Sequence, residues 1–155
     1  MSKTELKNNI KYHLIENIPN KNILDLLLNC YTSIFEDAVQ EFFIQRIHEK
    51  ENILSVLAFH NKQLVGFKIG YRYNSNTFYS WIGGVLPKYR ANGIAAQLAN
   101  LQEYWVKNNG YKKLRTKSMN RYKPMLILNI KNDFDIIQVY TNDSGQTKIV
   151  FEKVF

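Results

Sequence analysis

The chain has 155 residues, of which 45% are apolar and 22% charged, and its 21 Lys and Arg against 13 Asp and Glu give a formal net charge of +8. This composition excludes a disordered chain, and no window holds the roughly 18 consecutive apolar residues of a membrane span. The length suits one domain over residues 1–155, since a chain of this size buries about 70% of its unfolded surface. The charge indicates an anionic partner such as nucleic acid, a membrane surface or a phosphorylated small molecule.

The cysteine and histidine content indicates the cellular compartment and bears on whether the protein binds a metal. The single cysteine, Cys30, cannot form an intramolecular disulfide, and the first twenty residues lack the apolar segment of a secretory signal. We therefore expect a cytoplasmic protein. His13, His48 and His60 are isolated from one another and from carboxylate pairs, so we expect no metal site.

Hydrophobic periodicity divides the chain into eleven predicted elements. In chain order they are a strand at 10–17, a helix opened by Pro19-Asn20, a helix at 38–50, strands at 53–59, 63–73 and 78–85, a helix at 93–109, a strand at 113–119, a helix at 124–132, and strands at 134–140 and 148–154. In the second helix we expect Phe42, Ile44 and Ile47 on the buried side. The order predicts an α/β fold with a mixed sheet and helices on its faces.

The segment from Val85 to Ala95 joins a strand to the most regular helix, in which Ile94, Leu98 and Trp105 recur at helical spacing. A helix N-terminus leaves its first amides unpaired and carries about half a positive charge, which favours a bound anion. Small residues here let a phosphate approach, and Lys88 and Arg90 add charge. The pattern predicts a phosphate or pyrophosphate site; the alternative is a glycine-containing loop before an ordinary helix.

Two motifs in this chain resemble those of the GCN5-related N-acetyltransferases (GNAT). Arg90-x-x-Gly93-x-Ala95, after the strand end Gly83-Gly84-Val85, resembles the acyl-CoA-binding pattern Gln/Arg-x-x-Gly-x-Gly/Ala. The segment 125–134 is similar to the family's Ala-x-x-Leu-Tyr-x-x-x-Gly-Phe signature, with Asp133 in place of the glycine. The resemblance covers nearly the whole chain and implies the mostly antiparallel central sheet of the acyl-CoA N-acyltransferase fold.

The resemblance also implies acetyl-CoA as cosubstrate and assigns residues to it. The backbone around the pyrophosphate is that of Leu86, Arg90, Ala91, Asn92, Gly93, Ile94, Ala95 and Ala96. Val85 is implied to lie at a bulge, where its N–H polarises the thioester carbonyl, and Gly83-Gly84 independently fits a bulge. Asn120 matches a position whose polar side chain reaches the CoA arm.

The catalytic acid and base depart from the family pattern. Asn129 stands where the family has the tyrosine that protonates the leaving thiolate, and Asn cannot act as an acid; Tyr122 and Tyr140 are possible substitutes. Tyr79 falls at the position of an acidic base, although a phenol with a pKa of about 10 is a poor base at neutral pH. Glu36 is our candidate base, the alternative being an exposed acid that caps the second helix.

The resulting hypothesis is an N-acetyltransferase that passes an acetyl group from acetyl-CoA to a primary amine, on a small molecule or a peptide, through a ternary complex. We expect no membrane partner, and a homodimer is left open. The alternatives are a basic nucleic-acid-binding module and a catalytically degenerate CoA-binding protein. Residues 86–123 hold nine basic residues and one acid, so we expect the charge to serve the phosphates of CoA.

Overall fold

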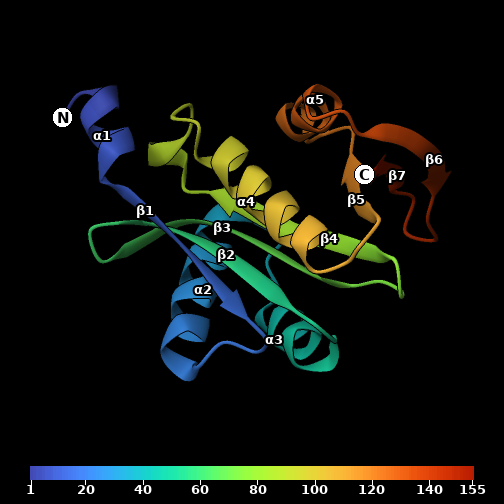
Figure 1. Cartoon of the computed structure of the whole chain (residues 1–155), viewed down its shortest axis with the longest axis horizontal. Helices are drawn as coiled ribbons and strands as arrows, with labels where there is room; N and C mark the ends of the chain where they lie inside the picture. The colour runs from blue at the N-terminus through green and yellow to red at the C-terminus, as the bar shows by residue number, and fades with distance from the viewer.

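A computed structural model describes residues 1–155 and shows one twisted sheet with helices on both faces (Figure 1). The strands are β1 (Ile10–Glu16), β2 (Leu54–His60), β3 (Gln63–Arg72), β4 (Thr77–Val85), β5 (Lys113–Met119), β6 (Asp135–Thr141) and β7 (Thr147–Val154). The helices are α1 (Lys3–Asn9), α2 (Lys21–Ile34), α3 (Gln40–Glu49), the 3₁₀ turn η1 (Pro87–Tyr89), α4 (Ile94–Asn108) and α5 (Lys123–Lys131).

The seven strands lie in the order β1-β2-β3-β4-β5-β7-β6. Every neighbouring pair is antiparallel except β4 and β5, which run parallel. The prediction of a mixed, mostly antiparallel sheet flanked by helices is therefore confirmed. No helix of the structure combines the length and the apolar character needed to cross a membrane.

Each face of the sheet carries its own apolar core. On the face covered by α2 and α3, Leu27 and Phe43 pack with Phe67 and Ile69 of β3. On the face covered by α4, a second cluster joins Leu98, Trp105 and Val106 to Phe78 of β4 and Leu114 of β5. Helix α5 lies beside α4 on this second face (Figure 1). The central strands are thus buried on both sides.

The structure differs from the predicted local structure at three places. Residues 3–9, for which the periodicity predicts no element, form α1, where Ser2 Oγ accepts from the Glu5 amide at 3.1 Å and Glu5 Oε2 accepts from the Ser2 amide at 2.9 Å. Phe42 is 71% exposed, because the buried stripe of α3 runs through Phe43 and Ile47. The bulge in β4 lies at Trp81, where the register with β3 steps from Ile82 to Ser80, and not at Gly83-Gly84 or Val85.

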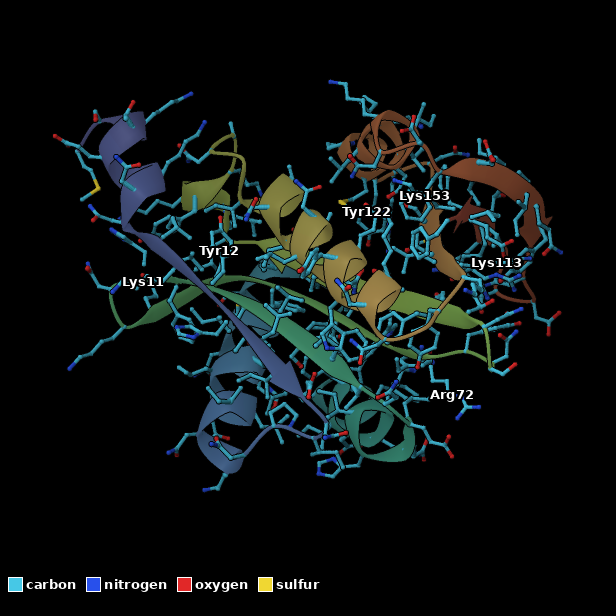
Figure 2. The ribbon with its side chains drawn as sticks, in the orientation of Figure 1. Lys11, Tyr12, Arg72, Lys113, Tyr122 and Lys153 are labelled. Carbon is cyan, nitrogen blue, oxygen red and sulfur yellow. The ribbon has the colours of Figure 1, made fainter.

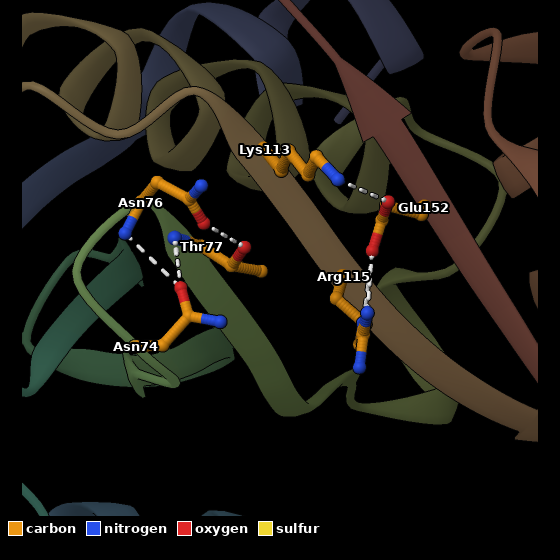
Figure 3. Close-up of polar contacts among 6 residues, drawn as sticks. All are labelled: Asn74, Asn76, Thr77, Lys113, Arg115 and Glu152. Carbon is orange, nitrogen blue, oxygen red and sulfur yellow. Dashed lines mark hydrogen bonds and ion pairs between the residues drawn. The ribbon is translucent and has the colours of Figure 1, made fainter.

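Strands β4 and β5 are fixed together at the ends where they begin. Asn74 Oδ1 accepts from the amides of Asn76 at 3.0 Å and Thr77 at 2.8 Å, which closes the turn before β4 (Figure 3). The Asn76 carbonyl then accepts from the amides of Lys112 and Lys113 at 2.7 and 3.1 Å. The start of β5 is tied to the start of β4, so any separation of these two strands has to occur at their other ends.

Candidate functional site

The parallel pair β4 and β5 separates partway along the sheet. Thr77–Ser80 pair with Lys113–Thr116, and the side chain of Thr116 donates to the Ser80 carbonyl at 2.9 Å at the last paired position. Beyond this point β4 continues to Val85 beside β3, whereas β5 continues to Met119 beside β7. Tyr122 follows β5 at this separated end, opposite the end where Lys113 begins the strand (Figure 2). The separation leaves a gap in the middle of the sheet.

A cavity of about 550 Å³, which we call the central cavity, occupies this gap. Residues from both separated strands line it, together with residues from α2, α3, β3, α5 and the β6–β7 hairpin. They are Tyr31, Phe35, Asp37, Arg46, Lys68, Tyr79, Ser80, Trp81, Ile82, Gly83, Thr116, Lys117, Ser118, Met119, Arg121, Tyr122, Met125, Asn129, Tyr140, Gln146 and Lys148. The cavity therefore borders both faces of the sheet.

Two backbone N–H groups of β4 point into the gap. The Leu86 amide donates to the Val65 carbonyl at 2.8 Å, which makes Gly66 and Val85 a non-hydrogen-bonded pair of the antiparallel ladder. In such a pair the N–H groups point away from the partner strand, here toward the separated β5. The same alternation applies two residues earlier at Gly83, which also lines the central cavity. Both amides can stabilise negative charge in the gap.

The loop after β4 forms the predicted anion cradle. Gly93 has φ +77° and is the N-cap of α4, whose first backbone bond runs from the Gln97 amide to the Gly93 carbonyl at 3.0 Å. The amides of residues 94–96 consequently have no acceptor within the helix. Arg90 Nε donates to the Val85 carbonyl at 3.0 Å, and Asn92 Nδ2 donates to the Tyr89 and Arg90 carbonyls at 3.0 and 2.9 Å. These bonds hold the loop open at the helix start.

Lys7 of α1 lies beside the cradle, which the sequence pattern did not reveal. A Cβ built on Gly93 would meet no atom nearer than Cε of Lys7, at 3.9 Å. The cradle thus has room for a phosphate, and a positive charge from the first helix stands at its rim. The residues present fit a pyrophosphate group: unpaired amides, a helix N-terminus and adjacent cations.

The predicted catalytic residues are distributed unevenly around the central cavity. Asn129 is 6% exposed and lines it, as do Tyr79 and both proposed substitutes for the tyrosine, Tyr122 and Tyr140. Burial raises the pKa of the Tyr79 phenol above its ordinary value. Glu36 is exposed and is not among the lining residues; its neighbour Asp37 is.

The remaining predicted site residues do not place their side chains in the lining of the central cavity. Asn120 is exposed in the turn after β5 and also stands outside the lining of the central cavity. The side chain of Val85 is buried in the α4 core, so only its backbone faces the gap. Leu86 packs between the two cores, and Ile94, the first residue of α4, is buried in the core under that helix.

Lys68 is a cavity residue that sequence reasoning missed. It pairs with Gly83 across β3 and β4, and a Cβ on Gly83 would lie 3.2 Å from its Cγ. The lysine stem thus lies over β4 where Gly83 leaves room, and the residue lines the gap together with Ser80 and Asn129. No carboxylate pairs with it, and burial lowers the pKa of its ammonium to about 8. The only sequence feature that could have identified it is the occurrence of a lysine within a strand of alternating apolar residues.

Positive charge dominates the central cavity. Five of its lining residues are basic and one, Asp37, is acidic, and Asp37 is held by Arg121 at 3.0 Å. Arg46 lies over the Trp81 ring at 5.2 Å, and Lys117 lies 6.0 Å from the Tyr79 ring and 5.6 Å from the Tyr140 ring. Lys148 Nζ donates to the Met119 sulfur at 3.4 Å.

The charge of residues 86–123 does not all face the cofactor side, which corrects the expectation from the sequence. Leu114 packs under α4, so the alternation of β5 sends Lys113, Arg115 and Lys117 to the other face. Glu152 pairs with Lys113 at 3.3 Å and with Arg115 at 2.7 Å (Figure 3). Lys117 has no such partner.

Comparisons with known proteins agree with this geometry. The model of the acetyltransferase (GNAT) family matches residues 20–124. The fold is similar to the ribosomal-protein-S18-alanine N-acetyltransferase of Escherichia coli, with a TM-score of 0.78 and 13% identity over 93% of this chain and 94% of that chain.

Two further solved structures share the fold. A GNAT family acetyltransferase of Elizabethkingia anophelis with acetyl-CoA bound has a TM-score of 0.75 and 23% identity, over 96% of this chain and 99% of that chain. NAA60 of Arabidopsis thaliana in complex with acetyl-CoA has a TM-score of 0.73 and 19% identity, over 94% and 99%. At these identities the likeness is one of fold. No curated protein matches the sequence.

Proposed function

Because the chain belongs to the acetyltransferase (GNAT) family, we propose that it transfers an acetyl group from acetyl-CoA to a primary amine through a ternary complex. The observation that carries this proposal is the position of the anion cradle directly after the separated end of β4. A cofactor whose pyrophosphate binds at the start of α4 can extend its arm along β4 into the central cavity. Acetyl-CoA supplies an activated acetyl thioester there.

Several groups of the chain suit the cofactor and the charge that develops during transfer. Unpaired amides at residues 94–96, with Lys7 nearby, would hold the pyrophosphate. The N–H groups of Gly83 and Val85 point to where the thioester carbonyl would lie and would stabilise negative charge on its oxygen. Lys68, mostly protonated at neutral pH, adds a positive charge to the same gap. It can offset the charge of the departing thiolate where Asn129 offers no acid.

Direct transfer is favoured over a covalent acyl-enzyme. Cys30, the single cysteine, is 4% exposed on α2, and burial raises the pKa of its thiol to about 12. A thiol in that state forms almost no thiolate at neutral pH and cannot act as nucleophile. The buried thiol thus supports direct attack of the amine on the acetyl carbon, with both substrates bound together.

The acceptor amine would enter from the α2/α3 face, away from α4. Neither predicted base is well suited to take its proton: Glu36 is exposed outside the lining, and Tyr79 holds its own proton more firmly than a free phenol. The amine can lose its proton to water instead. Among structural neighbours, one is named for an alanine of a ribosomal protein and another is an aminoglycoside 6'-N-acetyltransferase, so peptide and small-molecule amines both fit this fold.

The proposal is tested by measuring acetyl-CoA binding by calorimetry and its turnover with a panel of small amines and N-terminal peptides. Turnover with at least one amine supports it. Tight binding of acetyl-CoA with no transfer to any amine would favour a degenerate CoA-binding protein. Retention on DNA without any acetyl-CoA binding would favour a nucleic-acid-binding module.

A further inference from the structure

The cations on the α2/α3 face of the central cavity that lack a carboxylate partner point to a property of the acceptor. Arg46, Lys117 and Lys148 line the cavity, and none of them forms an ion pair. The cavity's single carboxylate, Asp37, is already paired with Arg121. Elsewhere in the molecule, some basic side chains are paired with acids: Glu152 pairs with Lys113 and Arg115 of β5, and Glu103 pairs with Lys153 at 2.7 Å.

These cations face away from the phosphates of the cofactor. The cradle lies at the N-terminus of α4, whereas Lys117 stands on the opposite face of β5, against the rings of Tyr79 and Tyr140. Lys148 belongs to β7 and pairs with Met119 at the separated end of β5. Arg46 comes from α3, on the same face as Lys117. The positive potential on the α2/α3 face therefore acts on the acceptor, which would bind on the side opposite the cofactor.

Unpaired cations in a partly enclosed site lower the energy of an anion there and raise that of another cation. Tyr79, Trp81 and Tyr140 line the same cavity, and their aromatic surface lowers the local dielectric constant, which strengthens both effects. A purely cationic acceptor such as a polyamine would find one carboxylate already neutralised and three cations facing it. An acceptor that carries a negative group would supply the partner they lack.

Resting on the proposed function, we propose that the acceptor is a primary amine bearing an anionic group, a carboxylate or a phosphate, held by Lys117, Lys148 and Arg46 on the α2/α3 face of the central cavity. The negative group fixes the molecule at the β5–β7 side. Its amine is then directed across the cavity toward the amides of Gly83 and Val85.

A matched set of two-carbon amines tests this inference: O-phosphoethanolamine, β-alanine, ethanolamine and 1,2-diaminoethane. They differ in the group at the end opposite the reacting amine. The kcat/KM of each compound is divided by the fraction of its amine that is unprotonated at the assay pH. We expect kcat/KM for the phosphate and carboxylate compounds to exceed that for ethanolamine by about tenfold or more, as one to two charge-assisted contacts provide. The diamine should be the poorest acceptor.

Single-residue variants identify which lysines cause the preference for an anionic acceptor. Lys117→Gln and Lys148→Gln should each lower the ratio of anionic to neutral acceptor by at least about threefold, the loss of one partly exposed charged contact. Lys112→Gln makes the same change in net charge at an exposed lysine outside the cavity and should leave the ratio unaltered. Calorimetric titration of CoA-saturated enzyme with O-phosphoethanolamine and with ethanolamine measures the same preference without turnover.

The source of the anionic group is distinguished by a second arm with the C-terminally amidated tripeptides Ala-Glu-Glu-NH2 and Ala-Gln-Gln-NH2, in which only the glutamates carry negative charge. If kcat/KM differs more between these two peptides than between the anionic and neutral small amines, the anionic group belongs to a peptide acceptor. If it differs less, the anionic group belongs to a small-molecule acceptor. Equal rates for anionic and neutral acceptors, a preference for the diamine, or an equal effect of Lys112→Gln would overturn the inference while leaving the transferase proposal intact. Absence of transfer to every amine despite acetyl-CoA binding would overturn both.

Discussion

Lys68 is held in the gap at a cost to stability that depends on pH. Burial lowers the pKa of its ammonium to about 8, whereas an unfolded lysine has a pKa of about 10.4. Between these values the unfolded chain binds more protons than the folded one, so this residue makes folding more favourable as the pH rises through that window. Below about pH 8 the unfavourable contribution is constant.

Replacing this lysine with an apolar side chain should therefore stabilise the protein. We expect Lys68→Met to have a higher free energy of unfolding than the unmodified protein at pH 7, with the difference decreasing from about pH 8 and becoming independent of pH near pH 10.5. Urea unfolding at pH 7, 8.5 and 10 measures it, with Lys112→Met as the exposed control. If both variants show the same pH dependence, Lys68 is not buried as a charge.

The same substitution should slow catalysis. Removing one positive group from the place where negative charge develops is expected to lower kcat by about tenfold or more, as the loss of an electrostatic contact in a catalytic site does. The Kd of acetyl-CoA, set mainly at the cradle, should change much less. A variant that gains stability and loses turnover would separate the functional role of Lys68 from a structural one. Unchanged kcat would remove it from the mechanism.

Tyr79 provides a complementary prediction. Because burial keeps its phenol protonated throughout the physiological range, it cannot contribute an ionisation to the reaction near neutral pH. Tyr79→Phe should therefore show a pH profile of kcat/KM between pH 6 and 9 with the same shape as that of the unmodified protein. The loss of one limb of the profile in this variant would instead identify Tyr79 as the base.

At the scale of single elements, the start of α4 carries the sharpest prediction. Gly93 has a positive φ, which Asn and Asp tolerate better than other side chains, so Gly93→Asn and Gly93→Asp impose a similar strain and differ in charge. A carboxylate at this helix start opposes a bound pyrophosphate. We expect Gly93→Asp to weaken acetyl-CoA binding by about 100-fold and Gly93→Asn by about tenfold or less, measured by calorimetry. Equal losses would show that strain dominates.

The elements themselves were largely predictable, because each rests on a local pattern. Strand β5 has the predicted bounds, and α4 begins and ends within one residue of the prediction, since a regular apolar stripe and the terminal Gly110, with φ +85°, define it. Helix α1 was missed because it has no buried residue and hence no apolar period, although the pair Ser2 and Glu5 is a capping-box signal. In α3 the stripe was assigned one position too early, at Phe42.

The cofactor side was predictable for the same reason, and the acceptor side was not. The cradle lies within a dozen consecutive residues, and its glycine and small residues carry a physical signature. The walls of the central cavity come from α2, α3, β3, β4, β5, α5 and the β6–β7 hairpin. Lys68, Lys117 and Lys148 meet there only because β7 inserts between β5 and β6 and because β4 leaves β5 at Ser80. No local pattern encodes that arrangement.

For the whole molecule, the distribution of charge distinguishes a cofactor site from a nucleic-acid surface. Acetyl-CoA would be held by backbone amides at a helix start as well as by cations, so its binding should survive moderate salt. Binding to DNA through side-chain charges alone weakens steeply with salt. We expect acetyl-CoA to raise Tm at both 50 and 300 mM NaCl and retention on a DNA column to be lost by the higher concentration. The reverse pattern would favour the nucleic-acid-binding alternative.

The state of Cys30 has a practical consequence for measuring this chemistry. The protein holds a single thiol, which is almost fully buried and has a pKa raised to about 12. The folded enzyme should therefore be nearly silent toward disulfide reagents that turn yellow on reacting with free thiols. Each molecule of CoA released would then appear as colour against a negligible protein background, so turnover of an unidentified acceptor can be followed continuously, without labelling the acceptor or isolating its product.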